Sequence, residues 1–138
     1  MKIRWQDHYY SMVLTAILVV TTLMSDFGRE WLMYGLDKIK DGEYWRILTG
    51  HLVHLNLEHS ILNISGLIII AYMFERNAKW WSWAGLTLFM SLGCSVLFLL
   101  LNSQPGEENY LQWYVGLSGT LHGLFFIAAI SEWPVDRR

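Results

Sequence analysis

A serine set between glycines is the feature of this sequence best suited to chemistry. Positions 116–119 form a G-x-S-G motif around Ser118, near the start of an apolar stretch at positions 110–130. Glycines beside a serine let backbone approach closely and leave the hydroxyl uncovered, as a nucleophile requires. Helix packing is the alternative, because Gly119 and Gly123 form a small-xxx-small pair of the kind found where membrane helices meet. Taken alone, the motif leaves both interpretations open.

A second polar pair, His59 and Asn63, opens the apolar stretch at positions 60–74. Residues four apart share a helix face, with Cβ atoms about 5–6 Å apart, so the two side chains are expected side by side. Polar side chains inside a membrane are costly and tend to line a cavity or a pathway. Both can donate a hydrogen bond to an oxyanion. The alternative is a hydrogen bond between helices that holds the bundle together.

Histidines also raise the question of a metal site. His51, His54 and His59, with Glu58, contain enough nitrogen and oxygen ligands for zinc. Their spacing matches no recognised ligand motif, however, and a loop at the membrane surface explains them without a metal. We therefore expect no metal and no cofactor.

The elements that must position these residues are membrane helices. The chain has 138 residues, of which 54% are hydrophobic, and it contains 8 Trp, 7 Tyr and 6 Phe, which is too apolar and aromatic for an ordinary soluble domain. The basic residues are scattered and the net charge is −2, so no nucleic-acid partner is indicated. A helix needs roughly 20 apolar residues to cross a bilayer. We predict an all-α membrane protein with four transmembrane helices, at positions 9–25, 60–74, 80–101 and 110–130.

The polar and aromatic segment at positions 26–58 is predicted to be one large outer loop. Its length indicates a functional or partly embedded segment with short helices, because backbone at membrane depth must satisfy its own polar groups. Positively charged residues favour the cytoplasmic side of short loops, which predicts that both termini are cytoplasmic. That orientation places Lys2, Arg4, Arg76, Lys79, Arg137 and Arg138 inside, and it places Arg29, Lys38, Lys40 and Arg46 outside, where acidic residues outnumber them.

These motifs resemble one family. Trp45-Arg46, the pair His54 and His59, the His59-xxx-Asn63 spacing and the G-x-S-G motif stand in the order and spacing of rhomboid intramembrane serine proteases. The resemblance runs from about position 42 to the end of the chain. Positions 114–124 look most like the rhombosortase branch, which comprises small bacterial rhomboids associated with proteins bearing Gly-Gly-containing C-terminal sorting tails.

The resemblance implies a single rhomboid-like domain over positions 1–138, in the bacterial inner membrane, with its active site toward the outer side. Its substrates would be membrane-anchored proteins. Ser118 would attack a peptide carbonyl, and the oxyanion would be bound by the Ser118 backbone N–H and the side chains of His59 and Asn63. The supporting residues implied are Gly116 and Gly119 beside the serine, Trp45 and Arg46 in the embedded loop, and His54 as polar support for that loop.

The sequence departs from the family at the general base. Rhomboids have six helices and a Ser-His dyad whose histidine lies in the sixth, and no residue here matches that histidine. We therefore expect the chain to lack the fifth and sixth helices, and a serine without a base is a weak nucleophile. Gly119 and Gly123 are expected to offer a groove to such a further helix.

His122 lies four residues after Ser118 and could contact it as a substitute base. The family places a flat side chain at this position, beside the true base, so His122 is expected to belong to that shell. Two alternatives to proteolysis remain at this point: a non-catalytic rhomboid-like protein that binds transmembrane segments, or an inactive truncated fragment.

Overall fold

The computed structural model describes residues 8–75, 78–101 and 112–132. Within these residues the fold is mostly helical, as predicted, with one additional pair of two-residue strands. The elements are α1 (Tyr9–Leu23), α2 (Ser25–Leu32), β1 (Tyr34–Gly35), α3 (Leu36–Lys40), α4 (Arg46–Thr49), α5 (Leu57–Phe74), α6 (Trp80–Leu101), β2 (Trp113–Tyr114) and α7 (Ser118–Glu132).

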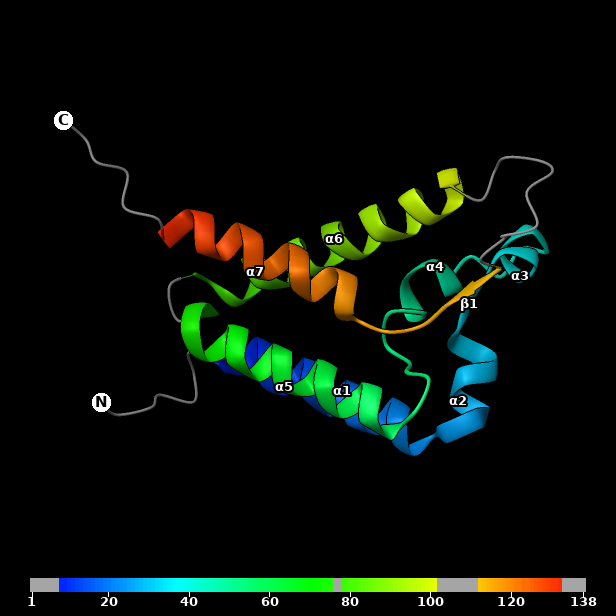
Figure 1. Cartoon of the computed structure of the whole chain (residues 1–138), viewed down its shortest axis with the longest axis horizontal. Coiled ribbons are helices and arrows are strands. Elements are labelled where there is room, and N and C mark those ends of the chain that lie inside the picture. The colour runs from blue at the N-terminus through cyan, green and yellow to red at the C-terminus, as the bar shows by residue number, and fades with distance from the viewer. Residues whose placement is uncertain (1–7, 76–77, 102–111, 133–138) are drawn as a thin grey trace.

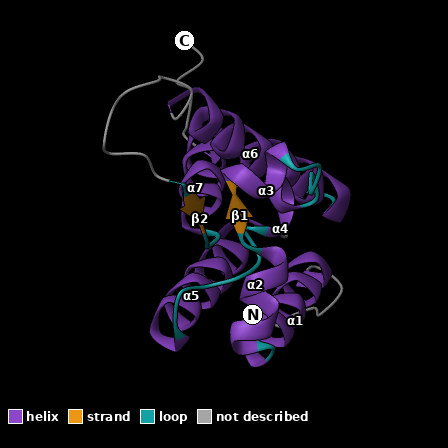
Figure 2. Ribbon diagram, turned by 90° about the vertical axis from the view of Figure 1, so that its right-hand side faces the viewer, coloured by secondary structure: helices purple, strands orange, loops and turns teal. Residues whose placement is uncertain are grey.

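The long helices form two packed pairs, α1 with α5 and α6 with α7, and α5 also packs against α7 (Figure 2). The starts of α1 and α6 and the ends of α5 and α7 lie at one end of the bundle, whereas α2, α3 and α4 lie at the other end (Figure 1). The buried apolar core lies between the two pairs and includes Leu14, Leu18, Leu67, Ile70, Phe74, Trp83, Leu117, Leu121, Leu124 and Ala128.

Two of the predicted helix boundaries are wrong because the backbone leaves the helical region there. The first helix ends at Leu23, since Ser25 has a φ of 52°, and α2 then turns by 109° from α1. The last helix begins only at Ser118, because β2 and Gly116, with a φ of 110°, occupy the residues before it. Helix α5 begins earlier than expected, at Leu57, because the Asn56 side chain caps it by accepting a hydrogen bond from the His59 N–H at 2.8 Å.

Among the described residues, α5 and α6 are long and apolar enough to cross a bilayer. Helices α1 and α2 satisfy the same criteria only as a pair with a sharp bend between them. Helix α7 has 15 residues, which corresponds to a length of about 22 Å. The part of the chain that the structure describes therefore contains two helices with the composition and length of membrane spans, and a third if the bent pair is one broken span.

The glycines of α7 face α6. A Cβ atom on Gly123 would lie 2.6 Å from the Met90 Sδ atom, and one on Gly119 would lie 3.1 Å from the Cys94 Sγ atom. The expectation that these two glycines form a groove for a further helix is therefore wrong. The close contact predicted for them is made within the chain, by α6.

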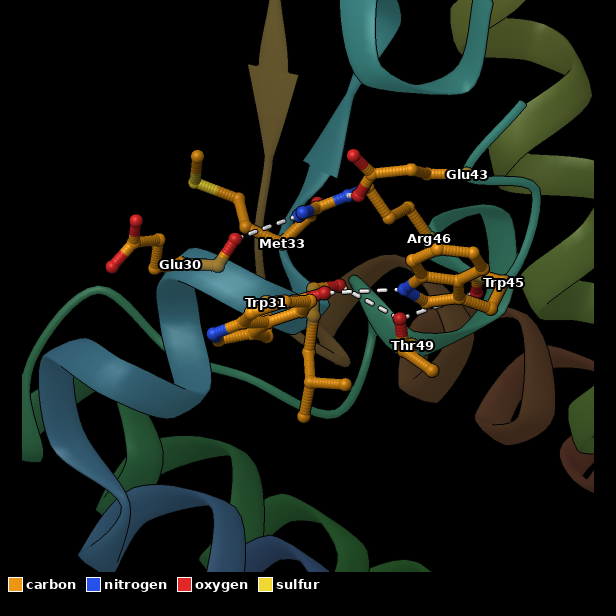
Figure 3. Close-up of polar contacts among 8 residues, drawn as sticks. Glu30, Trp31, Met33, Glu43, Trp45, Arg46 and Thr49 are labelled. Atoms are coloured by element: carbon orange, nitrogen blue, oxygen red, sulfur yellow. Dashed lines mark hydrogen bonds and ion pairs between the residues drawn. The ribbon is translucent and has the colours of Figure 1, made fainter. Parts of the chain in front are cut away.

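Short helices do form in the loop between α1 and α5, as predicted, and Arg46 holds that loop together (Figure 3). The Arg46 side chain is only 5% exposed. It donates to the Glu43 carboxylate at 2.6 Å and to the backbone carbonyl oxygens of Glu30 and Met33 at 2.8 and 2.9 Å. A guanidinium group suits this position because its planar fork can serve several acceptors at once.

Trp45 and Thr49 add two bonds between α4 and the end of α2 (Figure 3). The Trp45 indole N–H donates to the Trp31 carbonyl oxygen at 3.2 Å, and the Thr49 hydroxyl donates to the Leu32 carbonyl oxygen at 2.8 Å. Trp45 and Arg46 thus both belong to the loop, where the sequence placed them.

The same loop is tied to the segment that precedes Ser118. Strands β1 and β2 pair antiparallel, with Tyr34 opposite Tyr114. The Gly116 N–H donates to the Gly50 carbonyl oxygen at 3.0 Å. A Cβ atom on Gly50 would lie 2.7 Å from the Tyr34 backbone nitrogen, so only glycine fits at this crossing. The loop between α1 and α5 therefore supports the backbone that leads into α7.

Candidate active site

A cavity of about 520 Å³ lies between α5 and α7. Polar residues that the sequence analysis singled out line this cavity. Ser118, His59 and Asn63 all line it, although Asn63 and Ser118 are far apart in the chain. The remaining lining consists of Leu62, Gly66, Ile69, Ile70, Leu121, His122 and Phe125. Leu62 and Phe125 are also exposed on the surface, so the cavity opens to the outside of the molecule.

Ser118 is the first residue of α7 and therefore lies where the helix has backbone N–H groups without intrahelical acceptors. Such a terminus carries partial positive charge and favours an anion. The turn before it depends on Gly116, whose positive φ of 110° suits glycine, and its carbonyl oxygen accepts a hydrogen bond from the Tyr114 hydroxyl at 2.6 Å. The Gly116 turn and the Tyr114 hydrogen bond thus position Ser118 at the N-terminus of α7.

The His59 imidazole reaches across from α5 and packs against Gly116. A Cβ atom on Gly116 would lie 2.7 Å from the Cε1 atom and 2.9 Å from the Nε2 atom of His59. Gly116 is therefore needed for close approach as well as for its backbone angle. This contact places the His59 ring against Gly116, which is two residues before Ser118 in the chain.

Asn63 is 4% exposed, and its amide is oriented by a bond within α5. The Nδ2 atom donates to the His59 carbonyl oxygen at 2.9 Å. An amide has two N–H groups, so one remains available to the cavity. The Oδ1 atom is buried and has no hydrogen-bond partner among the described residues.

His122 contacts the backbone of Ser118. Its Nδ1 atom lies 2.7 Å from the Ser118 carbonyl oxygen, and because a carbonyl only accepts, Nδ1 must carry the proton. Among the hydrogen bonds of the described residues, none joins His122 to the Ser118 hydroxyl. The ring is exposed at the side of the cavity, and its basic nitrogen is Nε2.

His54 lies behind His59 and is 8% exposed. The two rings meet edge to face, with centroids 5.2 Å apart. Burial, and secondarily the neighbouring His59, lowers the pKa of His54 to about 4, so that it is neutral at physiological pH. Neither His54 nitrogen has a hydrogen-bond partner among the described residues, so its contact with the site is the ring contact with His59.

Comparison with known proteins shows the family of the chain. A family model described as the Rhomboid domain matches residues 41–137, which is more than half of the chain. This chain belongs to the rhomboid family. A similar protein is the rhomboid protease GlpG of Haemophilus influenzae, which is 30% identical over 127 residues covering 86% of this chain and 60% of that protein. This rhomboid therefore spans about 60% of the length of that relative. Its family and its apolar helices make it a multi-pass membrane protein.

Sequence reasoning gave no role to Tyr114, whose hydroxyl is hydrogen-bonded within the rhomboid serine motif. Burial raises the pKa of its hydroxyl, and a hydrogen bond with the Ser118 side chain opposes that rise in part. Because the Tyr114 hydroxyl donates to the Gly116 carbonyl oxygen, it accepts from the Ser118 hydroxyl. No local pattern signals this bond, since it depends on the bend at Gly116.

His51 is a second residue whose position only the structure reveals. It is 1% exposed, its ring meets the edge of Tyr114 at a centroid distance of 5.3 Å, and its Nε2 atom lies 2.9 Å from the Ser95 hydroxyl. That hydroxyl donates to the Ile47 carbonyl oxygen at 2.6 Å, so it accepts from His51. Burial lowers the pKa of His51, which keeps the ring neutral.

This placement bears on the zinc alternative. The His51 Nε2 atom is hydrogen-bonded to the Ser95 hydroxyl, while the rings of His54 and His59 pack edge to face. In the part of the chain that the structure describes, no group of three or more His, Cys, Asp or Glu side chains is arranged to hold a metal ion.

Proposed function

We propose that this rhomboid is an intramembrane serine endopeptidase that cleaves membrane-anchored protein segments through an acyl-enzyme on Ser118. One observation carries the proposal: Ser118, His59 and Asn63 line the same cavity, which opens between two helices. A binding module has no need for a serine at a helix N-terminus beside two hydrogen-bond donors. An acyl-transfer enzyme needs that combination.

In the proposed reaction, the Ser118 Oγ atom attacks the carbonyl carbon of the scissile peptide bond. The developing oxyanion is stabilised by the Ser118 N–H, the His59 imidazole and the free N–H of Asn63. The C–N bond then breaks, and the leaving amine takes the proton given up by the Ser118 hydroxyl. Water then hydrolyses the ester to a carboxylic acid and restores the Ser118 hydroxyl. Tyr114 holds the serine hydroxyl in the resting state and must release it during the attack.

The proposed orientation has both termini in the cytoplasm and the active site on the outer side of a bacterial inner membrane. Support comes from the charges at the two ends of the bundle. Lys79 lies beside the start of α6, whereas the acidic residues of the loop between α1 and α5 outnumber its Lys and Arg at the other end. We include in this proposal four membrane-crossing segments within one domain, residues 1–138.

The substrates proposed are proteins with Gly-Gly-containing C-terminal sorting tails, because positions 114–124 resemble the rhombosortase branch. The cavity between α5 and α7 would admit such a tail from the side, past the exposed side chains of Leu62 and Phe125.

Labelling with a fluorophosphonate tests the nucleophile directly. Membranes containing the protein are treated with the probe, and we expect label on the native chain, none on Ser118→Ala, and undiminished label on Ser82→Ala, an exposed serine at the start of α6. Label that persists in Ser118→Ala, or a native chain that takes up no label while a second rhomboid in the same membranes does, overturns the proposal.

Non-catalytic binding of transmembrane segments is the second candidate. It is favoured by one observation: among the described residues, the hydrogen bonds include none between a histidine and the Ser118 hydroxyl. A serine needs a base to become a good nucleophile. Client proteins that copurify equally with the native chain and with Ser118→Ala, and that remain uncleaved, would select this candidate.

A further inference from the structure

His122 is a titratable residue of the cavity to which the proposed reaction gives no role. Its imidazole is exposed on α7, and it lines the cavity together with Ser118. A polar side chain exposed on a helix of a membrane protein is costly in lipid, so such residues face water-filled cavities and pathways. The position of His122 therefore indicates a function inside the cavity.

The His122 ring is held in one orientation and one tautomer. Its Nδ1–H donates to the Ser118 carbonyl oxygen at 2.7 Å, which leaves the lone pair on the Nε2 atom. Among the hydrogen bonds of the described residues, none engages this Nε2 atom. His59, the other histidine that lines the cavity, packs its ring against Gly116 instead. His122 therefore presents a basic nitrogen in a fixed orientation beside Ser118.

The Ser118 hydroxyl does not use this nitrogen in the resting state, because it donates to the Tyr114 hydroxyl. Once Ser118 is acylated, its Oγ atom has no proton to donate, and this bond with Tyr114 is lost. The group that then needs a base is the water that attacks the ester. The cavity of about 520 Å³ has ample room for a water molecule beside the acyl group.

We infer that the Nε2 atom of His122 is the general base of the deacylation step. This inference rests on the proposed function, because it requires an acyl group on Ser118. The water oxygen forms a bond to the acyl carbon while one of its protons passes to Nε2. The bond between the acyl carbon and the Ser118 Oγ atom then breaks, and the proton returns from Nε2 to Oγ. The products are a carboxylic acid, the serine hydroxyl and a neutral imidazole.

Acetylation by p-nitrophenyl acetate tests this inference, because its good leaving group lets a serine react with little help from a base. Release of p-nitrophenol measures acylation, and Ser118→Ala gives the background. After the excess ester is removed, intact mass spectrometry follows the loss of the acetyl group and so measures deacylation alone.

His122→Asn keeps an N–H group for the Ser118 carbonyl oxygen but has no basic nitrogen. We expect its deacylation to be slower by about 100-fold or more, while its acylation changes by less than about threefold. His8→Asn is the matched control. It makes the same substitution at the start of α1, at the opposite end of the bundle from Ser118, and both rates should remain native (Figure 1).

Deacylation of His122→Asn at the native rate overturns the inference while leaving Ser118 as the nucleophile, and so do equal losses in acylation and deacylation. An acetyl group that stays on the native chain also overturns it, because no base then serves the water. If the native chain takes up no more acetyl than Ser118→Ala, the proposed function fails and this inference fails with it. Thermal unfolding in detergent shows whether each variant is folded. His122→Gln, which also lacks a basic nitrogen, supplies the comparison if His122→Asn does not fold.

Discussion

The imidazole of His59 fills the space that a side chain on Gly116 would need. Their closest approach, measured from a Cβ atom built on Gly116, is 2.7 Å to Cε1 of His59. This contact joins the start of α5 to the turn that precedes Ser118. It is the relationship on which the proposed oxyanion site depends, because it fixes a donor from one helix beside a nucleophile on another.

Gly116→Ala should therefore remove most of the reactivity of Ser118. The new methyl group must displace His59, and the backbone must also hold an alanine at a φ of 110°. Losing one oxyanion donor costs about 100-fold in rate or more, and we expect at least that loss in fluorophosphonate labelling.

Gly42→Ala is the control for backbone strain. Gly42 has a φ of 101° with nothing within 4 Å of an added Cβ atom. The substitution should cost about 1–2 kcal/mol of stability and leave the labelling rate unchanged. Equal losses of labelling in the two variants would mean that the contact with His59 is unimportant.

Gly123→Ala should weaken the packing of α7 against α6. An added methyl group would lie 2.6 Å from the Met90 Sδ atom, so Met90 must move, and overpacking of this kind costs about 1–3 kcal/mol. Unfolding in detergent measures the loss. The double variant with Met90→Ala should recover part of it, whereas Gly93→Ala, at an open position of α6, should cost nothing. Additive losses in the double variant would contradict the contact.

Arg46→Met should destabilise the loop between α1 and α5. The change leaves the Glu43 carboxylate and the carbonyl oxygens of Glu30 and Met33 without their donor, and removing one partner of a buried ion pair costs about 3–5 kcal/mol. We expect a clear fall in Tm and earlier proteolysis of the loop. Lys40→Met, at an exposed position of the same loop, should change Tm little.

Acid should destabilise the protein through His54. Burial lowers its pKa to about 4 in the folded state, whereas an unfolded histidine titrates near 6.5. The unfolded state therefore binds more protons between these values, and stability falls as the pH drops from about 6.5 toward 4, by up to roughly 3 kcal/mol.

Measurements of Tm at pH 7.5 and pH 5 check this expectation. The difference between the two pH values should shrink in His54→Phe, which keeps a flat ring against His59 but cannot titrate. If His54→Phe shows the same dependence on pH as the native protein, the effect lies with another group, and His51, whose pKa burial also lowers, is the next to replace.

The sequence alone determined the family and the mostly helical membrane fold, and it singled out Ser118, His59 and Asn63, which share one cavity. The spacing of His59 and Asn63 places both on one helix, and glycine beside Ser118 marks a turn where a hydroxyl can stand free. The resemblance of these motifs to rhomboids then predicted that two helices bring them together, and the structure has all three residues on one cavity. Short helices in the loop between α1 and α5 also followed from its length and polarity.

Only the tertiary structure decided which neighbour each face meets. Helical periodicity says that Gly119 and Gly123 lie on one side of α7, but it does not say that this side meets Met90 and Cys94 of α6. Helical periodicity likewise predicts that His122 lies near Ser118, but it does not reveal that the His122 Nδ1–H donates to the Ser118 carbonyl oxygen.

The hydrogen bonds of Tyr114 to Ser118 and of His51 to Ser95 join residues that no local pattern pairs. They form only after the backbone turns at Gly116 and the loop between α1 and α5 folds onto α6. Local sequence sets the conformation and composition of each element, whereas long-range contacts are set by the shape of the assembled helices.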